Sequence, residues 1–294
     1  MMRRPSVLIA LCASLAFAAV AHAEPLPQRW VSAGGALSEW IAALGGQARL
    51  VGVDTTSQHP ESLKALPSVG YQRQLSAEGI LSLRPDVLVG TEEMGPPPVL
   101  AQVKQAGVRV ELFSSKADLA AVDENLKHLG TLLGAERQAG ILASEYRQRV
   151  AALQAAIAQA KTQQKAPGVL LLVGHGGGKP MIAGQDTAGA WLVEQAGGHN
   201  LAEHAGYKNV SVESLAGLDP EVLVVSDRAL IGEAAVQAML KENPGLSATR
   251  AARDGRIVVL DPTLLVGGLG PRLPEALQSL ARAFYPKGNV SLQP

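Results

Sequence analysis

A tyrosine and an arginine stand two residues apart in the segment Gly70-Tyr71-Gln72-Arg73, and their types suit the binding of a metal ion. An ionised phenol is a hard, anionic oxygen donor for ferric iron. A free phenol has a pKa of about 10, so the metal and a nearby positive charge must favour the anion. In an extended loop Arg73 would point the same way as Tyr71 and serve that purpose. The simpler interpretation of Tyr71 is a partly exposed side chain that anchors a loop.

The elements that would position this segment belong to a phrase that occurs twice, at 76–89 and again 135 residues later at 211–224. Its pattern is Ser-x-Glu-x-(Ile/Leu)-x-x-Leu-x-Pro-(Asp/Glu)-Val-Leu-Val. The serine caps a short helix, the glutamate lies in the first turn where the helix dipole favours an anion, and the proline ends the helix. The Val-Leu-Val run is typical of a strand buried on both faces of a parallel sheet. The repeat therefore predicts two related α/β lobes.

The N-terminal residues 1–23 have the features of a secretory signal, with two arginines, an apolar run and an Ala-His-Ala end. A lipoprotein signal centred on Cys12 fits less well, because leucine precedes the cysteine where a small residue is needed. Cys12 is the only cysteine, so we expect the mature chain to have no disulfide and no thiolate ligand. Charges balance at 26 basic and 26 acidic residues, which argues against nucleic-acid binding. We expect an exported, monomeric protein of the periplasm.

Alternation of apolar runs with helical patterns predicts the elements of both lobes. The expected strands are 30–32, 50–53, 87–89, 108–113, 169–173, 222–224 and 257–260. The expected helices, besides those of the repeated phrase, are 37–44, 99–106, one containing 191–193, and 234–241. We expect an N-terminal lobe at 24–135, a connecting helix at 136–166 and a C-terminal lobe at 167–294.

The connecting segment from Glu136 to Lys165 is rich in alanine, glutamine and charged residues and has no glycine after Gly140. This composition predicts one long helix, about 40 Å in length. A stiff connector of this kind would limit opening and closing of the lobes.

Signal sequence, duplicated α/β lobes and one connecting helix together resemble the substrate-binding proteins of bacterial ABC importers. The resemblance is to the class with a single-helix hinge, which serves cobalamin, siderophores and haem. It covers essentially the whole mature chain. It implies that Glu78 and Glu213, the glutamates of the repeated phrase, dock to arginines of an inner-membrane permease that works with an ATPase. On the residues alone each glutamate is explained by its favourable place in the helix dipole.

Within that class, a tyrosine followed two positions later by arginine or lysine resembles the periplasmic haem-binding subgroup. The segments 175–178, 181–184 and 197–200 are also similar to that subgroup. The resemblance implies that the ligand is haem and that Tyr71 is the axial ligand of its ferric iron. The protein would then be a carrier of haem and not an enzyme.

The roles of two arginines and a second tyrosine stay open at this stage. Arg73 could stabilise the phenolate while Arg228, at the end of a strand of the second lobe, binds a haem propionate, or the roles could be exchanged. Tyr207 could ligate a second face of the haem or a second haem. As a residue in a loop before the repeated phrase, it is explained more simply as a lid that packs on the ligand edge.

Other functions fit the sequence less well. His59, His175, His199 and His204 suggest a zinc or manganese site, but no pair has ligand spacing on a helix; His59 could approach the cleft between the lobes. The glycine run before Lys179 lacks the pattern of a phosphate-binding loop, and no G-x-S-x-G elbow of a hydrolase occurs. A cobalamin- or siderophore-binding protein shares the whole predicted architecture, so only Tyr71, Arg73 and the glycine segments favour haem over it.

Overall fold

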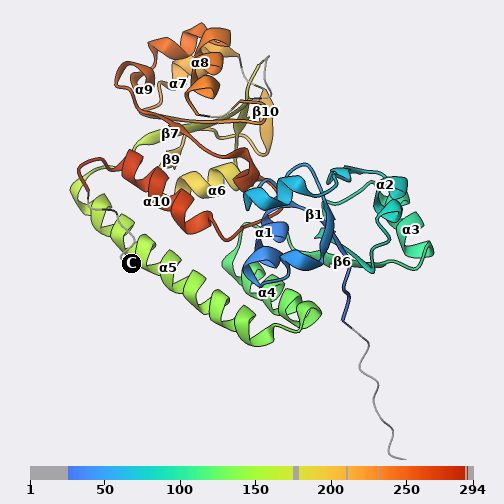
Figure 1. The fold of residues 1–294 in the computed structure, drawn as a ribbon. Helices are drawn as coiled ribbons and strands as arrows, with labels where there is room; N and C mark the ends of the chain where they lie inside the picture. The colour runs from blue at the N-terminus through green and yellow to red at the C-terminus, as the bar shows by residue number, and fades with distance from the viewer. Residues whose placement is uncertain (1–25, 175–178, 210, 231, 289, 291–294) are drawn as a thin grey trace, which may run out of the picture.

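The structure of the chain is a computed structural model, and it describes residues 26–174, 179–209, 211–230, 232–288 and 290. Two α/β lobes lie one above the other in Figure 1, and helix α5 (Glu136–Gln163) runs along one side of the molecule. This confirms the predicted fold class of two α/β lobes joined by one long helix. The predicted signal sequence at 1–23, with Cys12, lies outside the described residues.

The N-terminal lobe contains a four-stranded parallel sheet in the order β2-β1-β5-β6. A two-stranded antiparallel hairpin, β3-β4, lies apart from this sheet. The strands are β1 (Trp30–Ala33), β2 (Leu50–Val53), β3 (Gly70–Tyr71), β4 (Gln74–Leu75), β5 (Val87–Thr91) and β6 (Arg109–Phe113). The helices are α1 (Gly35–Ala43), η1 (Gln47–Arg49), η2 (Glu61–Ala65), α2 (Ala77–Ser82), α3 (Pro97–Gln105) and α4 (Leu119–Leu133). The hairpin and α4 were not among the predicted elements.

The C-terminal lobe contains a mixed sheet in the order β10-β8-β7-β11-β12, with β9 beside β7. Strands β7, β11 and β12 are parallel; β8 pairs antiparallel with β7, and the edge strand β10 pairs antiparallel with β8. The strands are β7 (Gly168–Gly174), β8 (Met181–Ala183), β9 (His199–Asn200), β10 (Tyr207–Asn209), β11 (Val222–Asp227) and β12 (Ile257–Val259). The helices are α6 (Ala188–Gln195), α7 (Val212–Leu218), α8 (Glu233–Glu242), η3 (Pro244–Ala248), α9 (Arg250–Arg253), η4 (Pro262–Leu265) and α10 (Leu273–Phe284).

The repeated phrase forms the same structure in both lobes. The runs 87–89 and 222–224 are fully buried strands. In each run the two valines join the core shared with α5, and the leucine joins the core on the opposite face of the sheet. Burial on both faces is what the Val-Leu-Val pattern predicted.

The helices of the phrase also begin and end alike. The Ser76 hydroxyl accepts the backbone N–H of Gly79 at 3.2 Å, and the Ser211 hydroxyl accepts that of Ser214 at 3.2 Å. Before the two prolines the backbone turns into the left-handed region, with φ of 48° at Arg84 and 38° at Asp219. The predicted caps are therefore confirmed, and the duplication includes an uncommon backbone conformation.

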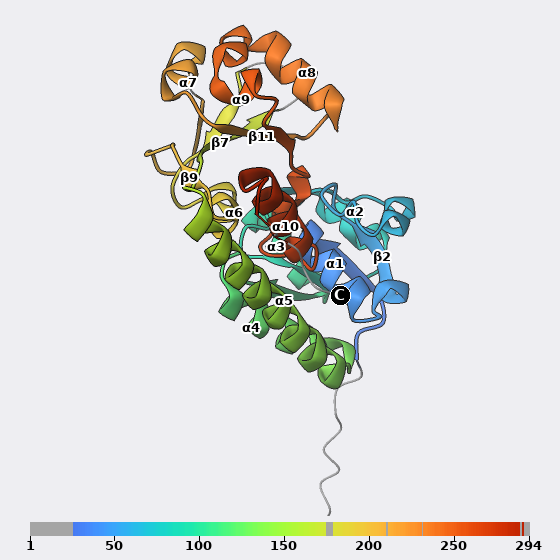
Figure 2. The ribbon, with the colours of Figure 1, turned by 90° about the vertical axis from the view of Figure 1, so that its left-hand side faces the viewer.

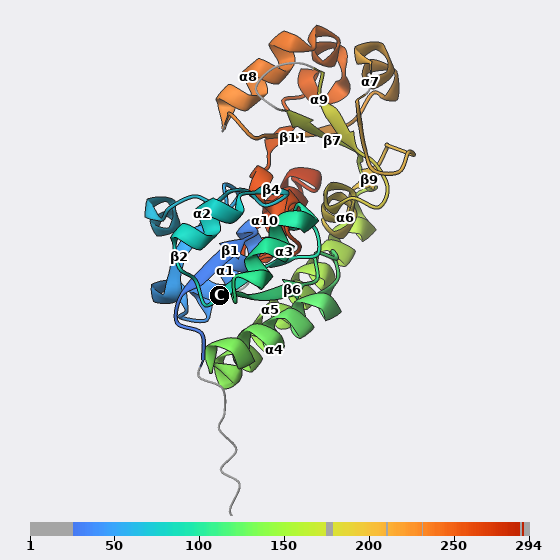
Figure 3. The ribbon, with the colours of Figure 1, turned by 90° about the vertical axis from the view of Figure 1, so that its right-hand side faces the viewer.

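Helix α5 has 28 residues and spans about 42 Å at 1.5 Å per residue. Its buried residues recur every three or four positions from Ala139 to Ala160, which gives one apolar stripe along its length. The stripe packs against α4 and α10. Figure 2 shows α10 beside α5, and Figure 3 shows α4 beside it from the opposite side. One hydrophobic cluster therefore continues from the first lobe through these helices into the second.

The chain returns to the N-terminal lobe near its end. The Trp40 indole N–H donates to the Leu269 carbonyl at 2.9 Å, and the Tyr146 hydroxyl donates to the Gly270 carbonyl at 3.3 Å. A segment predicted to lie within the second lobe thus rests on α1 and α5. The domain boundaries at 135/136 and 166/167 stay a prediction.

Candidate functional site

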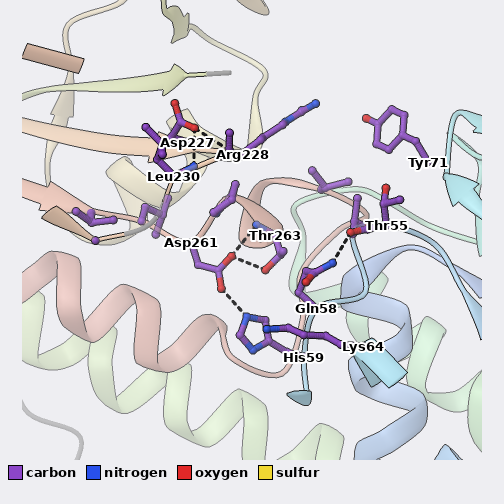
Figure 4. A pocket seen from close by; sticks show the side chains of 17 residues that line it. Thr55, Gln58, His59, Lys64, Tyr71, Asp227, Arg228, Leu230, Asp261 and Thr263 are labelled. Atoms are coloured by element: carbon purple, nitrogen blue, oxygen red, sulfur yellow. Dashed lines mark hydrogen bonds and ion pairs between the residues drawn. The ribbon is translucent and has the colours of Figure 1, made fainter. Parts of the chain in front are cut away.

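A cavity of about 750 Å³ lies between the two lobes. Its walls come from the segment after β2 in the first lobe and from the segments after β11 and β12 in the second (Figure 4). Open α/β sheets place ligand sites at the carboxyl ends of their parallel strands. The cavity is therefore where the topology predicts a binding site.

Tyr71 lies on the β3-β4 hairpin, and its phenol points into the cavity (Figure 4). Gly70 has a φ of +91°, a conformation that favours glycine, and pairs with Leu75 across the hairpin. The ring is half-buried, so its oxygen can meet a ligand that enters between the lobes.

Arg228 faces Tyr71 from the opposite lobe. Its guanidinium carbon lies 5.9 Å from the centroid of the Tyr71 ring, within the range of a cation–π contact. Asp227 holds the turn that contains Arg228, because its carboxylate accepts the backbone N–H groups of Ala229 at 2.7 Å and Leu230 at 3.0 Å. The structure brings Tyr71 and Arg228 together, although they are far apart in the sequence.

Arg73 is placed differently from the expectation of an extended loop. The hairpin pairs Tyr71 with Gln74, so residues 72 and 73 form the tight turn between the strands. The Arg73 guanidinium donates to the Glu93 carboxylate at 2.6 Å, and this hydrogen bond and charge raise the pKa of Arg73. The prediction that Arg73 points the same way as Tyr71 was wrong in its premise, because a turn replaces the extended backbone.

A second hollow between the lobes, of about 850 Å³, is lined by Arg73, Glu93, Lys116, Trp191 and Tyr207 among others. Tyr207 lies in β10 and is largely buried. Burial raises the pKa of its phenol, and the hydroxyl has no hydrogen-bond partner of regular geometry among the described residues. Tyr207 is therefore a poorer source of an anionic ligand than its residue type suggested, and it does not line the cavity that Tyr71 lines.

The wall of the cavity opposite Tyr71 is largely apolar. Leu230, Val259, Leu260, Pro262 and Val266 line it, and all of them belong to the second lobe. Val259, at the end of β12, keeps 39% of its surface exposed. Such a surface suits the face of a flat, apolar ligand.

A buried carboxylate holds the first-lobe wall in place. Asp54 is 2% exposed and accepts hydrogen bonds from the Gly34 N–H, from the Thr56 N–H and hydroxyl, and from the Ser57 hydroxyl, at 2.7–3.1 Å. Four bonds to one ion fix the loop after β2. Thr55 and Thr56 of that loop line the cavity on a rigid support.

The base of the cavity contains a charge network that joins the lobes. Arg272 donates two bonds to the Glu39 carboxylate, at 2.7 and 2.9 Å, and one to Asp261 at 2.8 Å. Asp261 also binds His59 at 2.8 Å (Figure 4). Burial alone would raise the pKa of Asp261, but hydrogen bonds from Thr263 and the charge of Arg272 outweigh it, so the pKa is lowered. His59 reaches the cleft, as expected, and is held there by Asp261.

The glutamates of the repeated phrase occupy matching positions. Glu78 is exposed in the first turn of α2, and Glu213 is in the first turn of α7, although its side chain lies outside the described part of the structure. His175 and the glycines that follow it also lie outside the described residues. Among the residues that the structure describes, no cluster of three or more histidine, cysteine or acidic side chains could hold a metal ion.

Several site residues were missed from the sequence. Glu93 and Lys116 follow β5 and β6, and Asp261 follows β12, so a search for charged residues just after each predicted strand would have found them. The partners Glu39 and Arg272 carried no such signal. The helices in the described ranges also include none with the length and apolar character of a membrane span.

Comparisons with known proteins agree with the fold. The family model described as periplasmic binding protein matches residues 31–264. A crystal structure of a periplasmic heme-binding protein from Pseudomonas aeruginosa is 62% identical, covers 90% of this chain and 95% of its own, and has a TM-score of 0.87. The periplasmic heme-binding protein RhuT from Roseiflexus sp. RS-1, in apo form, is 38% identical with a TM-score of 0.80, covering 88% of this chain and 98% of its own.

A more distant curated relative is a cobalamin-binding protein from Halobacterium salinarum. It is 26% identical over 265 residues, which cover 88% of this chain and 70% of the relative. The identities are therefore higher for the two solved heme-binding structures than for this cobalamin-binding relative.

Proposed function

The chain belongs to the periplasmic binding protein family, and from that membership we propose that it binds ferric haem between its lobes and delivers it to an inner-membrane ABC permease. Haem is the cargo, and the protein works in the periplasm as a carrier. The 62% identity to the heme-binding protein from Pseudomonas aeruginosa supports this cargo over cobalamin.

One observation carries the proposal: the Tyr71 phenol points into a cavity of about 750 Å³ that has an apolar wall on the opposite lobe. Haem needs an axial donor on one side of the ring and apolar contact for the porphyrin faces. Tyr71 supplies the donor from the first lobe, and the side chains around Val259 supply the apolar surface from the second. The role of Tyr71 as the axial ligand is part of the proposal.

The arginines have separate tasks in this proposal. Arg228 lies over the Tyr71 ring, where its guanidinium makes a cation–π contact with the proposed ligand. It extends from an exposed turn, so it can also leave the ring and pair with a propionate through two parallel hydrogen bonds. Arg73 lies on the side of Tyr207, and its charge is partly neutralised by Glu93. Tyr207 acts as a lid residue in the second hollow.

Delivery requires a surface that the permease recognises on both lobes. Glu78 is exposed at the start of α2, and the matching Glu213 starts α7. Because the two glutamates have equivalent places in the two lobes, each lobe can contribute one glutamate to contact with arginines of the permease. The ATPase acts through the permease, and the carrier works as a monomer.

Cobalamin and ferric siderophores are the alternative cargoes, and the similarity to a cobalamin-binding protein supports the first of them. Quenching of tryptophan fluorescence tests all three, because Trp191 lines the inter-lobe space. We expect saturable quenching by hemin at far lower concentration than by cyanocobalamin or a ferric hydroxamate siderophore. Tighter binding of either competitor would overturn the assignment of haem.

A further inference from the structure

Arg73, two positions after Tyr71 in the sequence, is engaged in an ion pair. The Glu93 carboxylate lies 2.6 Å from a terminal nitrogen of Arg73, and the side chains are 35% and 53% exposed. Glu93 belongs to the segment after β5, whereas Arg73 is in the hairpin turn. The pair therefore joins two loops that line the second hollow and, because both side chains are partly exposed, it can exchange partners with solutes.

The preceding residue, Glu92, has a different task. Its carboxylate accepts the backbone N–H of Ser115 at 2.8 Å and so ties the loop after β5 to the loop after β6. Two adjacent glutamates thus differ in function: Glu92 holds the backbone, and Glu93 occupies an arginine. A change of Glu92 to glutamine removes the same charge without touching Arg73.

Arg73 lies near both tyrosines of the inter-lobe space. Its guanidinium experiences the electrostatic influence of Tyr71, which shares its hairpin, and of Tyr207, which lines the same hollow. Lys116 also lines that hollow. A planar ligand whose centre is bound by Tyr71 can therefore direct a carboxylate at its edge toward Arg73. The guanidinium of Arg73 is already paired with Glu93.

We propose that Glu93 is a positioning residue that competes with a carboxylate of the bound porphyrin for Arg73. The inference rests on the proposed function and adds a determinant of affinity to it. Without ligand, Glu93 holds Arg73; on binding, a porphyrin carboxylate takes its place, since two carboxylates beside one guanidinium repel each other. On departure of the ligand Glu93 pairs again with Arg73, which favours release of haem to the permease.

The test compares hemin with hemin dimethyl ester, which has the same iron and ring but no free carboxylate. Dissociation constants are measured by absorbance titration for the wild type and for Glu93→Gln, Glu92→Gln, Arg73→Gln and the double variant Glu93→Gln/Arg73→Gln. We expect Glu93→Gln to bind hemin about three- to fivefold more tightly, the range of an exposed ion pair. The dissociation constant of the ester should change less than about twofold in Glu93→Gln. In Glu92→Gln the dissociation constants of both ligands should also change less than about twofold. The gain should vanish in the Arg73→Gln background.

Several results would overturn the competition. The competition would be refuted if hemin and its ester gained affinity equally in Glu93→Gln, if Glu92→Gln also gained affinity, or if the gain persisted without Arg73. Each of these results would show that any negative charge near the cleft weakens binding. Weaker hemin binding by Glu93→Gln, with Glu93→Ala behaving alike and both variants melting at the wild-type temperature, would contradict it directly. If the wild type binds neither ligand, the proposed function itself fails, and the inference falls with it. The position of the Soret band should stay unchanged in Glu93→Gln, because the iron ligand is untouched.

Discussion

Arg272 offers a strong test of how the two lobes are held together. Its guanidinium makes two hydrogen bonds to Glu39, on α1 of the first lobe, and one to Asp261, after β12 of the second. Glu39 is 5% exposed, so the change Arg272→Met leaves a buried carboxylate without its cation. We expect the variant to fold with lower stability and looser contact between the lobes.

The magnitude follows from the burial of the partners. Removing one member of a buried pair costs about 3–5 kcal/mol. Arg272 and Asp261 are 29% and 30% exposed, so water screens part of the charge. We therefore expect a loss of about 2–4 kcal/mol in the free energy of unfolding. At about 2–4 °C per kcal/mol for a chain of this size, the melting temperature should fall by roughly 4–16 °C.

Urea denaturation followed by circular dichroism at pH 7 measures this loss. The matched control is Arg149→Met, because Arg149 pairs with Glu275 where both side chains are about half exposed, and such a pair contributes about 1 kcal/mol or less. Adding Glu39→Gln to Arg272→Met should recover part of the loss, since the buried charge is then gone. If Arg272→Met costs no more than Arg149→Met, the network does not hold the lobes.

Two further predictions concern acid and transport. The pKa of Asp261 is lowered from 3.8 in the folded protein, so as the pH falls the unfolded chain takes up this proton before the folded chain does. The carboxylate therefore contributes stability above about pH 4, and this stability is lost as the pH falls through the lower folded pKa. Urea midpoints between pH 3 and 5 should therefore fall less steeply in Asp261→Asn than in the wild type, and equal slopes would contradict the assignment. Reversing the charges of Glu78 and Glu213 should abolish haem uptake by vesicles containing the permease while hemin affinity changes less than about twofold; loss of binding as well would mean that they stabilise the fold.

The repeat could be interpreted from the sequence because its signals are local. Caps, prolines and the Val-Leu-Val runs lie within fourteen residues of one another in each copy, and each part acts on its neighbours. The same holds for α5, whose composition alone favours a long helix. Helix α10 was missed although Leu273, Leu277, Leu280 and Phe284 repeat at helical spacing and are all buried.

The site was harder to predict because its contacts join distant parts of the chain. The position of Tyr71 followed from a family pattern, but the hairpin beneath it has strands of only two residues, too short for any periodicity. The partner of Arg73 lies 20 residues away and that of Arg272 lies 233 away. Such pairs depend on how loops from different strands come together in the fold. Secondary-structure propensity carries no information about these long-range contacts.

The most direct test of the central claim is a hemin titration of the mature protein beside Tyr71→Phe, followed by visible spectroscopy. The change removes only the phenol oxygen and keeps the ring against Arg228. We expect the wild type to give a saturable ferric haem spectrum with a phenolate-to-iron charge-transfer band, and the variant to lack that band and bind more weakly. Identical spectra and affinities in the two proteins would show that Tyr71 does not ligate the iron.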